Sequence, residues 1–194
     1  MLILAAVKCF GYKINRIIMV ILIAGATHTG KTFLSQKILE KYKFPYLSID
    51  HLKMGLIRSN LTNLTVYDDN LLLPYLWNIV KEIIKTAIEN GQNLIVEGCY
   101  IPFDWRTYFC KEYLDNIKCL FLVMSEEYIL KNYSDILSNA NCIENRATQD
   151  CSDREELIKE NIAVLKGCKQ HECSYFYIDK EYPTFDEIIN KLQL

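Results

Sequence analysis

The sequence has no large excess of charge of either sign, since 22 Lys and Arg residues face 24 Asp and Glu residues in a chain of 194 residues. No segment gathers Lys and Arg into a dense run, which disfavours nucleic acid as an obligate partner. The apolar stretch at residues 2–7 ends at Lys8, far short of the ~20 residues that a membrane-spanning helix needs. We therefore expect no obligate nucleic-acid partner and no membrane partner.

Histidine is scarce, and the cysteines lack the spacing of a metal site. The chain has 3 histidines and 8 cysteines, and no two cysteines are separated by the two residues typical of a zinc knuckle or redox motif. This pattern predicts reduced thiols in a cytoplasmic protein and argues against a structural metal. The cysteines are Cys9, Cys99, Cys110, Cys119, Cys142, Cys151, Cys168 and Cys173.

One segment has a specific motif: residues 25–32 read Gly-Ala-Thr-His-Thr-Gly-Lys-Thr, which fits the Gly-x-x-x-x-Gly-Lys-Thr pattern of a phosphate-binding loop. The glycines let the backbone turn sharply, so that successive N–H groups point toward phosphates. The helix that follows adds the positive end of its dipole. We expect the loop to bind ATP with Mg²⁺, with Lys31 at the β- and γ-phosphates and the Thr32 hydroxyl on the metal.

The predicted nucleotide-binding set comprises this loop and the residue after it. An apolar strand pattern precedes the loop and an amphipathic helix pattern follows it, as the motif requires. His28 occupies a free position of the motif and is not expected to be catalytic. The set is Gly25, Ala26, Thr27, His28, Thr29, Gly30, Lys31, Thr32 and Phe33. The alternative is an accidental glycine-rich turn.

Short apolar runs alternate with helical patterns along the chain, which predicts an α/β fold with a parallel sheet covered on both faces. Five runs have the pattern of strands: residues 17–24, 45–49, 93–96, 117–124 and 174–178. Helices are expected at residues 30–43 and 69–90. The apolar stripe of the second helix comprises Leu72, Leu76, Ile79, Ile83 and Ala87.

Two further helices are predicted by capping boxes at their N-termini, at residues 152–155 and 184–187. In the first of these helices, Ile158, Ile162 and Leu165 are expected to face inward. Between residues 138 and 152 the composition shifts to polar residues and Cys. We interpret residues 138–154 as a candidate lid, because the segment lies between two helical patterns.

The domain organisation predicted from these patterns is one domain over residues 19–194, preceded by an extension at residues 1–18. Met19 begins the apolar run that leads directly into the glycine loop. Our hypothesis is that Met19 is the functional start and that residues 1–18 are an upstream reading or a loose extension.

Acidic side chains follow three of the predicted strands: Asp179 follows the fifth, and the other two are candidates for the site. Asp50 comes after the second strand and Glu97 after the third. Ligands of an open parallel sheet bind beyond the carboxyl ends of its strands. These carboxylates are therefore candidate site residues.

On these residues the chain resembles the small P-loop kinases, namely the nucleotide kinases with the shikimate-kinase, chloramphenicol-phosphotransferase and zeta-toxin branches. The resemblance rests on the loop at 25–32, the segment 50–58, Val96-Glu97-Gly98 and a late polar segment with arginines. It covers residue 19 to the end, although only the loop is specific. It implies a three-layer P-loop NTPase fold with a five-stranded parallel sheet of order 2-3-1-4-5 and a short lid. The implied reaction transfers the γ-phosphoryl group of ATP to a bound acceptor.

The resemblance also implies roles for single residues. Asp50 would orient or deprotonate an acceptor hydroxyl, and the alternative is a helix N-cap. Glu97 would hold Mg²⁺ or its waters, and the alternative is a solvated strand end. Arg58 would bind an anionic group of the acceptor, or lie on the surface. Arg146 and Arg154 would neutralise charge on the transferring phosphoryl group, although Arg154 also fits a plain first-turn helix residue.

The acceptor stays open between a small molecule and a nucleotide. The loop lacks the proline and extra glycine common in adenylate kinases, and residues 97–102 replace the Asp-Gly-Phe-Pro-Arg segment of that group. An alternative function is a nucleotide-dependent regulatory ATPase or switch without a small acceptor. A third is a phosphate-binding protein that has lost catalysis, against which the intact Lys31 and Thr32 argue. The sequence does not predict the oligomeric state.

Overall fold

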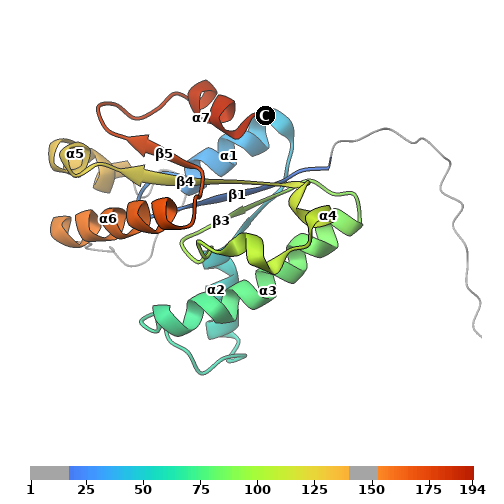
Figure 1. Cartoon of the computed structure of the whole chain (residues 1–194). Helices are drawn as coiled ribbons and strands as arrows, with labels where there is room; N and C mark the ends of the chain where they lie inside the picture. The colour runs from blue at the N-terminus through green and yellow to red at the C-terminus, as the bar shows by residue number, and fades with distance from the viewer. Residues whose placement is uncertain (1–17, 140–152) are drawn as a thin grey trace, which may run out of the picture.

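Five parallel strands form one sheet in the order β2-β3-β1-β4-β5 (Figure 1). The computed structural model describes residues 18–139 and 153–194. The strands are β1 (Val20–Gly25), β2 (Tyr46–Ser48), β3 (Leu94–Glu97), β4 (Ile117–Met124) and β5 (Tyr175–Ile178). Each overlaps one of the five predicted runs, and the predicted α/β class and strand order are confirmed.

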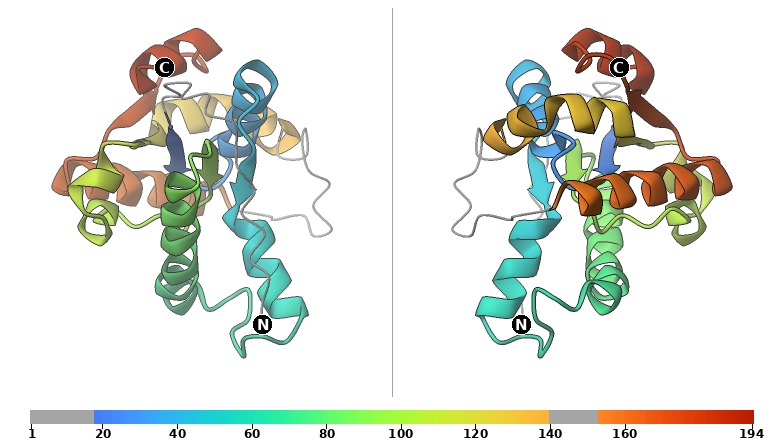
Figure 2. Two further views of the ribbon diagram at one scale, coloured as in Figure 1. Left: turned by 90° about the vertical axis from the view of Figure 1, so that its right-hand side faces the viewer. Right: turned by 90° about the vertical axis from the view of Figure 1, so that its left-hand side faces the viewer.

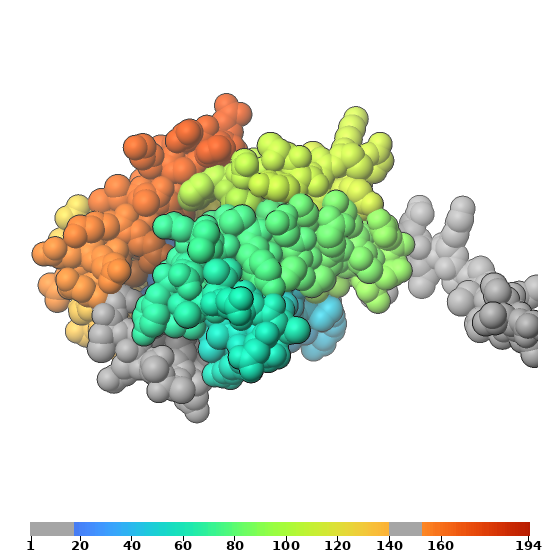
Figure 3. Space-filling model, turned by 90° about the horizontal axis from the view of Figure 1, so that it is seen from below, coloured from blue at the N-terminus to red at the C-terminus, as the bar shows by residue number. Residues whose placement is uncertain are grey.

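Helices cover both faces of the sheet and give the molecule three layers (Figures 1 and 2). One face carries α1 (Lys31–Tyr42) and α7 (Phe185–Leu192). The opposite face carries α2 (Ile49–Arg58), α3 (Asp69–Glu89), the 3₁₀ helix η1 (Trp105–Tyr108), α4 (Lys111–Leu114) and α6 (Arg154–Gln170). Figure 3 shows this face, with α3 between α2 and the segment that carries η1 and α4. Helix α5 (Glu126–Asn139) packs against α6 and the ends of β4 and β5.

The central strand β1 is apolar throughout because both of its faces are buried. Val20 and Leu22 pack on the side of α3, whereas Ile21 and Ile23 pack on the side of α1 and α7. All four side chains are fully buried. A strand that is covered on both faces needs continuous hydrophobicity rather than alternation. The same strand ends at Gly25 and thus holds the start of the glycine loop at the carboxyl edge of the sheet.

The predicted stripe of α3 is wrong in two places. The helix buries Trp77, Val80 and Ile84, whereas Ile79 and Ile83 are only half-buried. The large Trp77 ring makes edge contacts with Tyr108 and Phe109, at centroid distances of 6.0 and 6.2 Å. The segment after β3 therefore covers a flank of α3 that helical spacing alone does not identify.

The predicted inner face of α6 is also wrong at Ile162, which is 54% exposed. The buried position beside it belongs to Asn161, which is 1% exposed. Its Oδ1 accepts from the Met124 backbone N–H at 2.8 Å, and its Nδ2 donates to the Leu157 carbonyl at 2.9 Å. The amide thus satisfies backbone groups inside the core, and a reading based on apolar residues alone misses it.

The two predicted capping boxes have different outcomes. At the start of α7, Thr184 and Glu187 form both hydrogen bonds of the box, as predicted. Helix α6 begins at Arg154, and its N-cap Asp153 makes no side-chain capping bond; Ser152 lies outside the described residues.

Most of the candidate lid and most of the predicted extension lie outside the part of the chain that the structure describes. The undescribed residues are 140–152 of the lid and 1–17 of the extension. The start at Met19 therefore stays a prediction. Within residues 18–139 and 153–194, no helix has the length and hydrophobicity to cross a membrane.

Candidate functional site

The glycine loop connects β1 to α1, and its two glycines are required by backbone geometry. Gly25 has φ 138° and Gly30, the N-cap of α1, has φ 84°, both in the left-handed region that disfavours side chains. A Cβ atom at Gly25 would collide with the Leu122 carbonyl on β4, and one at Gly30 with the hydroxyl of Tyr182. The loop is thus closely packed against β4 on one side and Tyr182 on the other.

Substitution of Gly30 by alanine is expected to destabilise the protein by about 1–3 kcal/mol and to weaken ATP binding, because the loop must shift. Urea unfolding and ATP titration measure the two effects. Gly55→Ala is the matched control, since Gly55 lies within α2 and a Cβ there meets no atom within 4 Å. It should leave both quantities unchanged or raise stability slightly. Wild-type stability and ATP affinity in Gly30→Ala would contradict this account of the loop.

Internal hydrogen bonds hold the loop in shape. The Thr29 hydroxyl donates to the Ala26 carbonyl at 2.8 Å, and the Tyr182 hydroxyl donates to the Thr29 carbonyl at 3.1 Å. Tyr182 comes from the connection between β5 and α7, so the last part of the chain supports the loop. No local signal in the sequence points to this contact, which spans 153 positions.

Lys31 is the first residue of α1 and is only 7% exposed. Its Nζ donates to the Ala26 carbonyl at 2.7 Å. Burial opposes its charge, but nearby Cys99, Glu97, Asp50 and Glu160 outweigh burial and raise the pKa of the ammonium above its usual value. Lys31 is therefore a cation at neutral pH, near carboxylates from three segments, namely α2, the end of β3, and α6.

Thr32 and Glu97 form a pair of oxygen donors next to Lys31. The Thr32 hydroxyl donates to Glu97 Oε2 at 3.3 Å, and Glu97 is the last residue of β3. Glu97 is 2% exposed, so the alternative of a solvated strand end is wrong. Hydroxyl and carboxylate oxygens are ligands that Mg²⁺ accepts, directly or through its waters, so the residues present fit this ion.

Glu160 is a contact of the loop that sequence reasoning missed. The backbone N–H and the hydroxyl of Thr27 both donate to Glu160 Oε1, at 2.9 and 3.0 Å. Glu160 lies on α6, 133 positions along the chain, and no motif connects the two residues. The contact ties α6 to the loop and brings a carboxylate next to it.

Glu160→Gln is expected to bind ATP about tenfold more tightly, because the amide keeps an acceptor for Thr27 while the negative charge beside the triphosphate is removed. Glu160→Ala loses the hydrogen bonds as well and should bind ATP less tightly than Glu160→Gln. Calorimetric titration with ATP and Mg²⁺ measures the difference. Glu155→Gln is the control, since this side chain on α6 is 78% exposed. Equal affinity in Glu160→Gln and the wild type would show that the charge has no effect on binding.

A second polar group adjoins the loop beyond the ends of β2 and β3. Asp50, the second residue of α2, lies with Oδ1 3.1 Å from Lys53 Nζ. Lys53 Nζ donates to the Tyr100 hydroxyl at 3.0 Å, which in turn donates to Asp69 Oδ1 at 2.6 Å. We call Asp50, Lys53, Tyr100 and Asp69 the α2–α3 network. Figure 2 shows its two helices as neighbours on the same side of the sheet.

The structure rules out the alternative that Asp50 is a helix N-cap, and it adds Lys53, Tyr100 and Asp69 to the candidate site. The N-cap of α2 is Ser48, so Asp50 is not the cap. Burial raises the pKa of the Tyr100 phenol, and the hydrogen bond to Asp69 raises it further, so the hydroxyl stays protonated. Lys53 was missed from the sequence, although its spacing of three residues from Asp50 fits an ion pair on a helix.

The structure describes two of the three predicted arginines, Arg58 and Arg154, and both are exposed. Arg58 is exposed at the end of α2, about 12 Å along the helix axis from Asp50. The Arg154 guanidinium lies 4.7 Å from the Tyr133 ring centroid, over α5. Arg146 belongs to the segment that the structure does not describe. Phe33, at the end of the loop, is 40% exposed.

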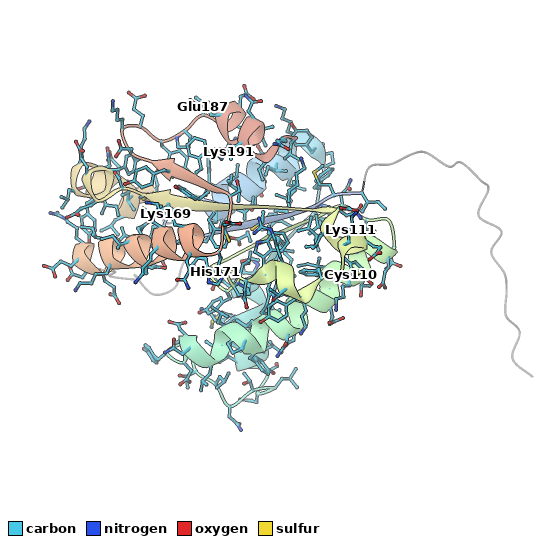
Figure 4. The ribbon with its side chains drawn as sticks, viewed as in Figure 1. Cys110, Lys111, Lys169, His171, Glu187 and Lys191 are labelled. Carbon is cyan, nitrogen blue, oxygen red and sulfur yellow. The ribbon has the colours of Figure 1, made fainter. Side chains whose placement is uncertain are left out.

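The cysteines that the structure describes are free thiols on separate elements. In Figure 4, Cys110 lies at the start of α4 and His171 at the end of α6. Within residues 18–139 and 153–194, no group of three or more His, Cys, Asp and Glu residues could hold a metal ion. Cys99 lies beside Lys31, and burial raises the pKa of its thiol.

The three-layer fold, with its glycine loop between β1 and α1, is the fold of the small P-loop kinases, which are the structural neighbours of this chain. A putative kinase from Chloroflexus aurantiacus is 18% identical with a TM-score of 0.56, over 91% of this chain and 97% of that chain. Shikimate kinase from Bacteroides thetaiotaomicron is 15% identical with a TM-score of 0.53, over 90% and 94% of the two chains.

Deoxyadenosine kinase from M. mycoides is 17% identical with a TM-score of 0.54, over 90% of this chain and 99% of that chain. No family model matches the sequence, and no curated protein matches it either. At 15–18% identity, what these proteins share with this chain is the fold.

Proposed function

We propose that the protein is an ATP-dependent phosphotransferase that moves the γ-phosphoryl group of ATP to a hydroxyl of a small-molecule or nucleotide acceptor. One observation carries the proposal: the loop residue Thr32 donates to Glu97, the last residue of β3, at 3.3 Å. Asp50 lies two residues after Ser48, which pairs with Glu97 in the sheet. A phosphate-binding group and a carboxylate suited to a hydroxyl are thereby combined at one edge of the sheet.

Each residue of the site has a role in this reaction. The loop N–H groups and Lys31 bind the phosphates and hold them in position. Thr32 and Glu97 would hold Mg²⁺ directly or through water, and the ion when bound neutralises charge on the phosphate oxygens. Asp50 orients the acceptor hydroxyl and takes its proton, as a bond forms from that oxygen to the γ-phosphorus and the bond to the bridging oxygen breaks.

The arginine roles stay predictions. Arg146 and Arg154 are proposed to neutralise charge on the transferring group. The role predicted for Arg58, binding an anionic group of the acceptor, applies to an acceptor that carries such a group. The five free thiols of the described residues support a cytoplasmic location, which is likewise a proposal.

The test is ADP formation from ATP and Mg²⁺ with four acceptor pools: nucleoside monophosphates, hydroxy acids, sugars with polyols and nucleosides, and amino sugars. We expect at least one pool to raise the rate well above the rate without acceptor. Acceptor-independent hydrolysis, or tight ATP binding without turnover, would instead support a regulatory ATPase or switch.

A further inference from the structure

We propose that the acceptor is a polyhydroxylated compound without an acidic group, such as a sugar, polyol, nucleoside or amino sugar, held by Asp50 and Asp69. This inference rests on the proposed phosphotransferase function and names the substrate class of the same site. It is carried by the composition and the hydrogen bonds of the α2–α3 network.

The network lies where an acceptor must bind. Asp50 is close enough to Lys31 to raise its pKa, and Tyr100 follows β3 by three residues. Asp69 is the first residue of α3 and is exposed, while the Asp50 side chain is 38% exposed. Both carboxylates are therefore accessible to solvent. Asp50 lies near Lys31, and Asp69 is linked to Asp50 through Tyr100 and Lys53.

The charges of the network favour an acceptor that donates hydrogen bonds. It contains two carboxylates and one ammonium, and the Lys53 ammonium is already in contact with both Asp50 and Tyr100. The Tyr100 proton is donated to Asp69. The groups still directed to solvent are thus carboxylate oxygens, which accept hydrogen bonds from O–H and N–H groups.

The same charges disfavour an acceptor that is itself a phosphate or carboxylate. Such a group offers only acceptor oxygens and negative charge, and it would lie against two carboxylates. The arginine on the same helix, Arg58, is exposed about 12 Å further along the axis and does not offset them. The network therefore selects against nucleoside monophosphates and hydroxy acids.

Asp69→Asn tests the inference together with the acceptor pools. The sugar, polyol, nucleoside and amino-sugar pools are expected to be the productive ones. For the active compound, Asp69→Asn should raise KM about tenfold and leave kcat and the ATP Kd near wild type, because the residue binds the acceptor and not the phosphates. Tyr100→Phe, which removes the hydroxyl between Lys53 and Asp69, should shift KM in the same direction.

Asp68→Asn is the matched control. It makes the same charge change one position away, where the side chain accepts from the Thr65 backbone N–H and hydroxyl, both at 2.7 Å, outside the network. It should leave KM unchanged. Activity confined to nucleoside monophosphates or hydroxy acids, or an unchanged KM in Asp69→Asn, would overturn the inference and leave the phosphotransferase intact. Absence of acceptor-dependent ADP formation with every pool would overturn the proposed function itself.

Discussion

Lys31→Ala is expected to lower kcat for acceptor-dependent phosphoryl transfer about a thousandfold, which corresponds to about 4 kcal/mol of transition-state stabilisation. The ammonium is buried at the loop and its pKa is raised, so it carries its positive charge at neutral pH. Negative charge on the γ-phosphoryl oxygens grows as the bond to the leaving oxygen breaks, and the ammonium stabilises this charge. No other lysine of the described residues contacts the loop by a hydrogen bond, so no second ammonium replaces Lys31.

The measurement is kcat from steady-state ADP formation at saturating ATP and acceptor, so that weaker ATP binding does not enter the rate. Lys37→Ala is the control, because Lys37 lies on the same helix, 45% exposed, and pairs with Glu40 at the surface. It should keep the wild-type rate. A Lys31→Ala variant that is folded and transfers phosphoryl groups within tenfold of the wild-type rate would remove the lysine from the mechanism.

Asp50→Asn is expected to lower kcat about a hundredfold and to leave the ATP Kd unchanged, because a general base acts on the acceptor hydroxyl and not on ATP. The amide has the same shape and keeps an oxygen for Lys53, so the ion pair at 3.1 Å becomes a hydrogen bond. Steady-state kinetics with the active acceptor and calorimetric ATP titration measure the two quantities.

A structural role of Asp50 needs its own control, since a carboxylate in a first helical turn also interacts with the helix dipole, by about 0.3–1 kcal/mol. Asp186 is the second residue of α7, as Asp50 is of α2, and lies 81% exposed. Asp186→Asn therefore makes the same change at the same helix position. If Asp50→Asn lost no more activity than Asp186→Asn, the general-base assignment would be wrong.

The sequence predicted well those features that are defined by residues close together in the chain. The loop at residues 25–32 is one continuous motif, and its glycines have the left-handed φ values that the motif needs. The strands were recognisable because a doubly covered sheet needs uninterrupted apolar runs such as Val20–Ala24. The capping box at Thr184 spans only four residues.

What the sequence could not predict depends on which distant segments meet. Glu160 contacts Thr27 across 133 positions, and Lys53 contacts Tyr100 across 47. No periodicity contains such pairs, because they are set by how α6, α2 and the segment after β3 pack on the sheet. Asn161 shows a related limit: its place in the core follows from backbone groups of β4 and α6 that need partners.

The arginine assignments stay predictions, and they rest on a weaker signal than the loop motif does. Arg58 and Arg154 were selected because arginine is rare in the chain and suits phosphate chemistry, which is an argument about residue type. The structure puts Arg58 on the surface and Arg154 over Tyr133. Residue type alone does not give position, whereas the loop motif gives both.

The most direct test of the central claim is the fate of the γ-phosphoryl group. ATP labelled with ¹⁸O in the γ-phosphoryl group is incubated with Mg²⁺, the protein and the active acceptor pool, and the products are followed by ³¹P NMR and mass spectrometry. The account predicts that the label appears in a new phosphate ester of the acceptor, in an amount equal to the ADP formed. Label that appears only in inorganic phosphate, at a rate independent of the acceptor, would contradict it.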